Sequence, residues 1–144
     1  MASLLKSLAV AGFGLLLSAA TTASAADVVV VVSSDSPVDS LSRAELADAY
    51  LGRVVRLPSG EPLLPLDQAE SSAAYERFYE NYLGRTPAQI KAHWSRLIFT
   101  GRGRPPPSLR DVETLADRIA ATPNAIGYMD AERVGDGLRV VQLE

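Results

Sequence analysis

The feature that most constrains the fold is an uninterrupted run of five valines at residues 28–32. β-Branched side chains favour extended backbone, and the polar residues Asp27 and Ser33 bound the run. A strand that is apolar at every position is buried on both faces, which is typical of a central strand in an α/β layer. The run therefore predicts an α/β fold built around this strand.

Two helices begin at capping boxes, in which a Ser or Thr and a Glu or Gln three residues later bond each other's backbone N–H groups. Ser42 and Glu45 open the first helix, and Thr86 and Gln89 open the second. Apolar residues at helical spacing predict a buried face for each. The buried stripe of the second helix is expected to be Ile90, Trp94, Leu97 and Ile98.

The stretch from residue 61 to residue 83 joins an apolar run to a long helix through a polar corner at residues 67–72. A strand that feeds a helix through such a corner directs backbone N–H groups and the positive helix end at one point, where α/β proteins often bind small anions. Aromatic residues recur on one face of the helix at i, i+3, i+4 and i+7, namely Tyr75, Phe78, Tyr79 and Tyr82.

The remaining elements complete a single α/β layer. Residues 54–57 and 63–66 flank a Pro-Ser-Gly-Glu turn and predict a hairpin or a near-hairpin excursion. A last helix is expected to start at Ser108, and strands are expected at residues 125–129 and 138–143. The predicted order is β, α, β-hairpin, α, α, α, β, β, which corresponds to a mixed sheet with flanking helices.

Residues 1–25 have the layout of a secretory signal peptide. Lys6 precedes an uncharged apolar run that ends in Ala23-Ser24-Ala25, so cleavage is predicted before Ala26. The alternative is a membrane anchor, but the apolar run is short for a bilayer and ends in a cleavage pattern. We expect a single domain of residues 26–144 that is periplasmic or secreted.

Composition narrows the chemistry of that domain. The chain has no cysteine, which excludes disulfides and thiolate metal sites, and His93 is its only histidine. We interpret His93 as a surface residue and predict no catalytic residue, metal site or cofactor. Without Lys6 there are 13 basic and 17 acidic residues, so there is no basic surplus to indicate a nucleic-acid partner.

Three segments together resemble a known family. They are residues 46–52 (LADAYLG), Trp94 with residues 98–101 (IFTG), and residues 122–128 (TPNAIGY). They look like the second lobe of type II periplasmic solute-binding proteins of the phosphate-binding kind, and especially like short chains labelled phosphate transporter substrate-binding proteins. The resemblance covers nearly all of residues 28–143. It implies one lobe of a fold that normally has two.

The resemblance also implies a ligand and a partner. In the two-lobed family an anion is held in the cleft between the lobes and delivered to an ABC transporter membrane component. The matching corner in that family carries an arginine and a Ser-Gly-Thr run. Here residues 67–73 read DQAESSA, without the arginine and with Asp67 and Glu70 in the region. Because arginine matches a phosphate bidentately, its absence predicts weak binding of phosphate by the monomer.

The candidate ligand-binding residues are Gln68, Ser71 and Ser72 at the corner, with Arg102 and Arg104 from a Gly-Arg loop. The arginines would supply the guanidinium groups that the corner lacks, with a dimer mate or a membrane partner as the second surface. The alternatives are that Asp67 and Glu70 only cap the helix and that the Gly-Arg loop is simply exposed. The aromatic side chains are expected to belong to the core, with a stacking platform for a ligand as the alternative; they are Tyr75, Phe78, Tyr82 and Trp94.

Two functional hypotheses follow from the sequence. The first is an exported, non-catalytic solute-binding domain that takes phosphate or another small anion for an ABC transporter. The second is a periplasmic interaction or structural module that has kept the lobe and lost the ligand site. A hydrolase is the least favoured class, because no nucleophile–base pair stands out.

Overall fold

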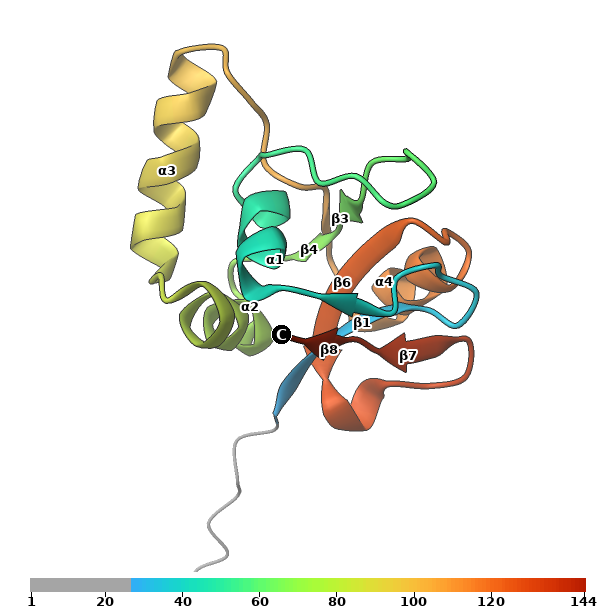
Figure 1. The fold of residues 1–144 in the computed structure, drawn as a ribbon. Helices are drawn as coiled ribbons and strands as arrows, with labels where there is room; N and C mark the ends of the chain where they lie inside the picture. The colour runs from blue at the N-terminus through green and yellow to red at the C-terminus, as the bar shows by residue number, and fades with distance from the viewer. Residues whose placement is uncertain (1–26) are drawn as a thin grey trace, which may run out of the picture.

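The computed structural model describes residues 27–144, and its centre is a four-stranded sheet in the order β3-β6-β1-β7 (Figure 1). The valine run forms the inner strand β1 (Val28–Ser33). β1 pairs antiparallel with β6 (Ala125–Asp130) and with β7 (Leu138–Val140), while β3 (Leu64–Pro65) lies parallel to β6. The predicted α/β fold with a mixed sheet is confirmed.

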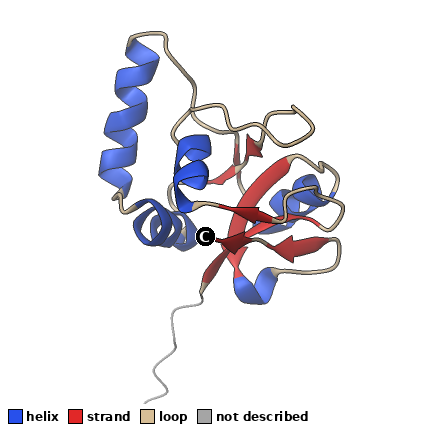
Figure 2. Ribbon diagram, viewed as in Figure 1, coloured by secondary structure: helices blue, strands red, loops and turns tan. Residues whose placement is uncertain are grey.

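Helices cover both faces of this sheet (Figure 2). Successive side chains of a strand point to opposite faces, so the valines of β1 divide between two apolar cores. Val28, Val30 and Val32 face a core shared with α1 (Arg43–Tyr50) and the helices that follow it. Val31 faces a smaller core, whose other buried members are Leu66, Leu115, Ile119, Ala125 and Met129.

The aromatic helix has two parts, α2 (Ala73–Phe78) and a π-helical continuation η1 (Tyr79–Leu83). Tyr75, Phe78 and Tyr79 are buried, and the Phe78 ring stacks on that of Tyr128 with 3.9 Å between centroids. Tyr82 is half-buried and donates a hydrogen bond of 2.6 Å to the Val28 carbonyl. The prediction that this face belongs to the core is confirmed.

The helix α3 (Pro87–Phe99) stands apart from the body at its C-terminal end (Figure 1). Ile90 and Trp94 are buried as predicted. Ile98 was expected in the same stripe, but it is 57% exposed, and Phe99 is 94% exposed. Apolar residues recur at helical spacing up to the end of α3. The last turn of the helix, however, extends beyond the rest of the protein, so its apolar side chains stay exposed.

Two pairs of very short strands differ from the prediction. β4 (Asp67–Gln68) pairs parallel with β5 (Ser108–Leu109), so the last helix, α4 (Val112–Ala120), begins four residues later than expected. The final strand breaks after β7, and β8 (Gln142–Leu143) instead pairs parallel with β2, residues Ser40–Leu41. Both errors have one cause, because two-residue strands carry no periodicity that a sequence can reveal.

The segment between α1 and β3 is a near-hairpin excursion, as predicted. Its only bridge joins Arg56 to Pro62 within the described chain. The Leu57 N–H donates to the Glu61 carbonyl and the Leu63 N–H to the Val55 carbonyl, each at 2.8 Å. Only Leu64 and Pro65 of the second arm then join the main sheet.

The N-terminal stretch is the part of the prediction that the structure leaves open. The predicted signal peptide, residues 1–25, lies outside the described residues, and export therefore stays a prediction. Across residues 27–144, no helix combines the length and the apolar character needed to cross a membrane.

Candidate functional site

The polar corner between β4 and α2 does not form the predicted capping box. Asp67 and Gln68 are buried in β4, whereas Glu70 is exposed in the turn that follows. The N-cap of α2 is Ser72, whose Oγ accepts a hydrogen bond from the Ala74 N–H at 3.2 Å. The hypothesis that Asp67 and Glu70 cap the helix is wrong, because strand pairing draws Asp67 into the interior.

The Asp67 carboxylate is held by hydrogen bonds from within the core. It accepts from the Tyr79 hydroxyl at 2.6 Å, from the Tyr128 hydroxyl and from the Gln68 N–H at 2.8 Å. Burial raises the pKa of Asp67, and these hydrogen bonds oppose the rise. Burial and the charge of Asp67 raise the pKa of both tyrosines, so each stays a hydroxyl donor. Asp67 therefore acts as a structural group.

The neighbouring polar side chains are also bonded to the protein. Gln68 Nε2 donates to the Tyr128 carbonyl at 2.7 Å, and Gln68 Oε1 accepts from Ser72 Oγ at 2.8 Å. Ser71 is exposed in the turn. Of the three predicted corner donors, only Ser71 is fully exposed. The side chains of Gln68 and Ser72 are already hydrogen-bonded to each other and to the backbone.

A pocket of about 230 Å³ nevertheless opens beside the start of α2, and both Gln68 and Ser72 line it. Three arginines from three separate segments surround it. Arg77 belongs to α2, Arg110 follows β5, and Arg133 ends the short helix η2 (Ala131–Arg133). The corner thus has guanidinium groups nearby, although none comes from the corner itself. We call this cavity the arginine pocket.

The three arginines differ in how strongly they are engaged. Arg77 forms an ion pair with Asp130 at 2.9 Å, and Arg133 forms one with Glu113 at 3.1 Å. Within residues 27–144, the Arg110 guanidinium makes no hydrogen bond or ion pair, and the side chain is exposed. Arg110 is therefore the cation of this pocket that is available to an incoming anion.

Sequence reasoning missed the arginine pocket for a definite reason. Its members come from α2, from the end of β5 and from η2, and only the parallel pairing of β4 with β5 brings Arg110 to the corner. The sole local signal was an arginine directly after Ser108-Leu109. A helix that starts at residue 108 would contain Arg110, and nothing in such a helix would connect Arg110 with the corner.

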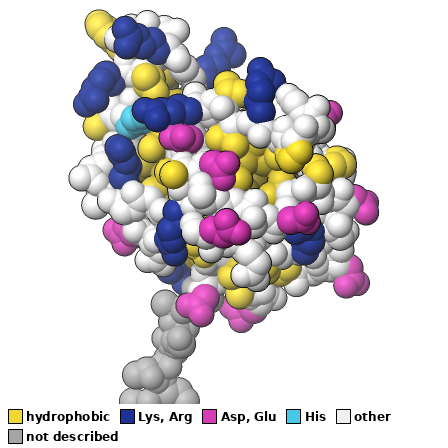
Figure 3. All heavy atoms as spheres, viewed as in Figure 1, with side chains coloured by type: hydrophobic (Ala, Val, Ile, Leu, Met, Phe, Trp, Pro, Cys, Tyr) yellow, Lys and Arg dark blue, Asp and Glu magenta, His cyan; other side chains and the backbone are white. Residues whose placement is uncertain are grey.

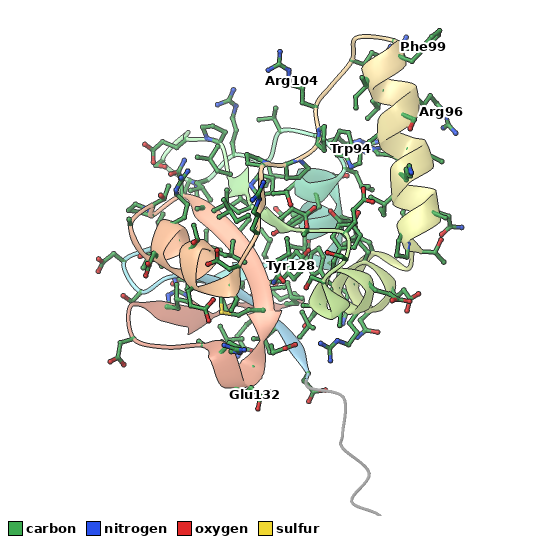
Figure 4. All side chains as sticks on the ribbon, turned by 180° about the vertical axis from the view of Figure 1, so that it is seen from behind. Trp94, Arg96, Phe99, Arg104, Tyr128 and Glu132 are labelled. Atoms are coloured by element: carbon green, nitrogen blue, oxygen red, sulfur yellow. The ribbon has the colours of Figure 1, made fainter. Side chains whose placement is uncertain are left out.

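The structure separates the predicted arginines from the corner residues. Arg104 lines a different groove of about 430 Å³ together with Arg53 and Arg118, and its side chain points away from the body (Figure 4). Arg102 is exposed, and its backbone N–H donates to the Leu97 carbonyl at 2.9 Å. That bond closes the C-terminal end of α3, so this backbone N–H group is not free to bind an anion together with the Gly-Arg loop.

A second groove, of about 350 Å³, lies between the corner and α3. Its lining combines the opposite charges of Glu70 and Lys91 with the apolar surfaces of Tyr75, Trp94 and Pro105. No guanidinium lines it, and the buried Asp67 contributes a second carboxyl group. This groove suits a small anion less well than the arginine pocket does.

His93 lies on the inner shoulder of α3. It is half-buried rather than fully exposed, and its Nε2 is 2.9 Å from the Leu51 carbonyl oxygen. Its ring also packs edge-on against Trp94, with 5.0 Å between centroids. Within residues 27–144, no group of three or more His, Asp or Glu side chains is arranged to hold a metal ion.

Comparison with known proteins shows which solved structures have a similar fold. No protein-family profile and no curated protein sequence matches the chain. An ABC-type phosphate transport receptor from Vibrio cholerae superposes with a TM-score of 0.62 at 16% identity, over 82% of this chain and 46% of the receptor. A phosphate ABC transporter substrate-binding protein with bound phosphate from Clostridium perfringens gives 0.62 at 15%, over 82% and 45%. The chain folds as one lobe of such receptors.

A third match has the same proportions. The PstS protein of Borrelia burgdorferi gives a TM-score of 0.61 at 13% identity, over 83% of this chain and 47% of the other. The chain therefore spans about half the length of the receptors that it resembles. The predicted likeness to phosphate-binding receptors is confirmed for the fold.

Proposed function

We propose that this protein is an exported, one-lobe solute-binding domain whose arginine pocket takes a small anion of the phosphate kind. One observation carries the proposal: Arg110 is unpaired within the described chain and faces the same pocket as Gln68 and Ser72. Guanidinium groups match the oxygens of phosphate-like anions, and the receptors of similar fold are described as phosphate transport proteins.

The charges of the pocket favour weak binding. Arg77 and Arg133 already neutralise Asp130 and Glu113, so a new anion competes with two existing ion pairs. A hydrogen bond to a charged group is worth about 1.5–3 kcal/mol, and Arg110 alone supplies such bonds without competition. A dissociation constant in the millimolar range, about 4 kcal/mol, is the expected result for the monomer.

The open arginine pocket indicates where further affinity would come from. In a receptor with two lobes a bound anion is enclosed, whereas here the arginine pocket is open to solvent and water competes for the anion. A second copy of the chain or the membrane component of an ABC transporter would supply a second wall for this pocket. In that arrangement the protein hands over its anion at the surface of its partner.

Isothermal titration of the purified protein with inorganic phosphate tests the anion site. We expect millimolar binding that weakens about fivefold or more in Arg110→Gln, since that change removes a charge-assisted interaction. Arg118→Gln is the matched control, because Arg118 is also exposed and lines another groove. Equal affinities in wild type and Arg110→Gln would contradict the assignment of the pocket.

An interaction module without a ligand is the second candidate function. Its supporting observation is that Asp67, Gln68 and Ser72 bond to the protein at the corner where the related family carries its binding residues. A thermal-shift panel of small anions separates the two candidates. A ligand at a hundred times its dissociation constant adds about 2.7 kcal/mol to stability, whereas an interaction module would show no shift with any member.

A further inference from the structure

A cationic arm extends from the body of the protein. We define it as residues 84–104, which comprise α3 and the loops at its two ends (Figure 1). The remaining described residues, 27–83 and 105–144, contain eight basic and seventeen acidic residues. The arm contains no acidic residue and five basic ones: Arg85, Lys91, Arg96, Arg102 and Arg104.

The positive charge of the arm is not neutralised by the body. Within residues 27–144, none of the five basic side chains forms an ion pair. Figure 3 shows Lys and Arg side chains gathered over the upper part of the molecule, where α3 ends, and most Asp and Glu side chains below. The protein is thus electrically polarised, although its net charge is only −3.

The tip of the arm adds an apolar group to this charge. Phe99 is 94% exposed and Ile98 is 57% exposed, and both belong to the last turn of α3. In Figure 4, Phe99 points outward at the end of the helix, with Arg96 one turn below it and Arg104 across the following loop. An aromatic ring exposed to this degree and flanked by arginines is unusual for a surface that meets only water.

We propose that the tip of the cationic arm docks on an anionic lipid surface. Phe99 and Ile98 enter the head-group region, and Arg96, Arg102 and Arg104 contact lipid phosphate groups. Amphipathic segments bind such surfaces through buried apolar area together with attraction between basic side chains and anionic lipids. The acidic body is repelled from the same surface, so the protein is oriented with its arm toward the membrane.

The size of the tip favours lipid over a protein partner. A buried aromatic side chain contributes about 150–250 Å² of contact, whereas a stable protein interface takes about 800 Å² from each partner. One Phe and one Ile at the end of a single helix fall well short of that area. Reversible lipid contact has no such requirement, because the apolar insertion and the basic charges act together.

Vesicle flotation tests the proposal. The full chain is mixed with vesicles of phosphatidylcholine alone or with about 30 mol% phosphatidylglycerol, an anionic lipid. We expect binding to the anionic vesicles to decline with added salt and to weaken about fivefold or more in Phe99→Ser and in Arg102→Gln/Arg104→Gln. Val140→Ser is the control, because Val140 is 44% exposed in β7 and lies outside the arm.

A position-specific measurement makes the test independent of the N-terminal residues, which all variants share. In Phe99→Trp, the added indole fluorescence, taken as the difference from wild type, should shift to the blue and be quenched by brominated acyl chains in anionic vesicles. Unquenched fluorescence, or equal flotation of Phe99→Ser and wild type, overturns the proposal. Sedimentation that shows a dimer lost in Phe99→Ser, without vesicle binding, assigns the tip to a second copy instead.

Discussion

The Tyr79 hydroxyl lies 2.6 Å from the Asp67 carboxylate, and this bond joins the aromatic helix to the strand β4. A buried carboxylate is costly unless hydrogen bonds satisfy it, and here Tyr128 supplies a second hydroxyl. The residue that the sequence suggested as a helix cap is thus a fixed point of the core. Its protonation state is linked to the stability of the whole domain.

The first prediction concerns pH. Burial raises the folded-state pKa of Asp67 above the ordinary value of 3.8, so the native state holds this proton more tightly than the unfolded state does. Stability from this group is therefore present at low pH and is lost as pH rises through the folded pKa. The unfolding free energy of wild type should fall relative to that of Asp67→Asn as the pH rises from about 4 through the folded-state pKa, as measured by urea melts. A constant difference across that range contradicts the prediction.

The second prediction concerns Trp94, which is buried at the contact of α3 with the body. Trp94→Ala should lower the free energy of unfolding by about 3–5 kcal/mol, because it leaves a cavity in the core. Phe99→Ala, five residues along the same helix and almost fully exposed, should change it by less than about 0.5 kcal/mol. Overlapping urea melts of Trp94→Ala and wild type would mean that the arm is not anchored by this residue.

The third prediction concerns the close approach of Gly52 to Trp94. Gly52 has φ of 95°, and a Cβ added there would lie 2.9 Å from a ring carbon of Trp94. Gly60 has a similar φ of 89° but open space around it, so it controls for backbone strain. Gly52→Ala should be more destabilising than Gly60→Ala by about 1–3 kcal/mol. Equal unfolding free energies for the two variants would show that the ring yields without cost.

Local signals predicted much of the fold because their causes are local. The capping boxes at Ser42 and Thr86 involve partners three residues away, and both are present. The burial of β1 could be predicted because its five valines are apolar without interruption. The predicted burial of Ile98 was wrong. Its helical spacing is regular, but its burial depends on how far the body of the protein extends along α3.

The candidate site was harder to predict because the residues that form it are far apart in the sequence. The hydroxyls that make a buried Asp67 tolerable lie 12 and 61 residues away, at Tyr79 and Tyr128. Arg110 reaches the corner only through the pairing of two strands of two residues each. The sequence near residue 67 has no pattern that indicates the tyrosine partners of Asp67 or the pairing of β4 with β5. The sequence therefore placed the corner between a strand and a helix, as the structure has it, but could not show which partners its side chains bond.

The fourth prediction separates the two corner serines by stability. Ser72 caps α2 and donates to Gln68, whereas Ser71 is exposed and makes no hydrogen bond among the described residues. Ser72→Ala should lower the free energy of unfolding by about 1 kcal/mol, a typical cost of losing an N-cap. Ser71→Ala should stay within about 0.5 kcal/mol of wild type. Thermal or urea melts without added anion measure both variants. A larger loss of stability in Ser71→Ala than in Ser72→Ala would contradict the assignment of Ser72 as the N-cap.

The last prediction concerns what these serines do for phosphate. If they formed the site themselves, as the family resemblance taken alone would imply, the monomer would bind phosphate tightly and the double variant Ser71→Ala/Ser72→Ala would lose that binding. The hydrogen bonds of Ser72 are already used within the fold, and the available cation is Arg110. Titration calorimetry should therefore give a millimolar constant for wild type, about 4 kcal/mol of binding, and a constant within about threefold of it for the double variant. Micromolar binding that disappears in the double variant would transfer the site from the arginine pocket to the serines.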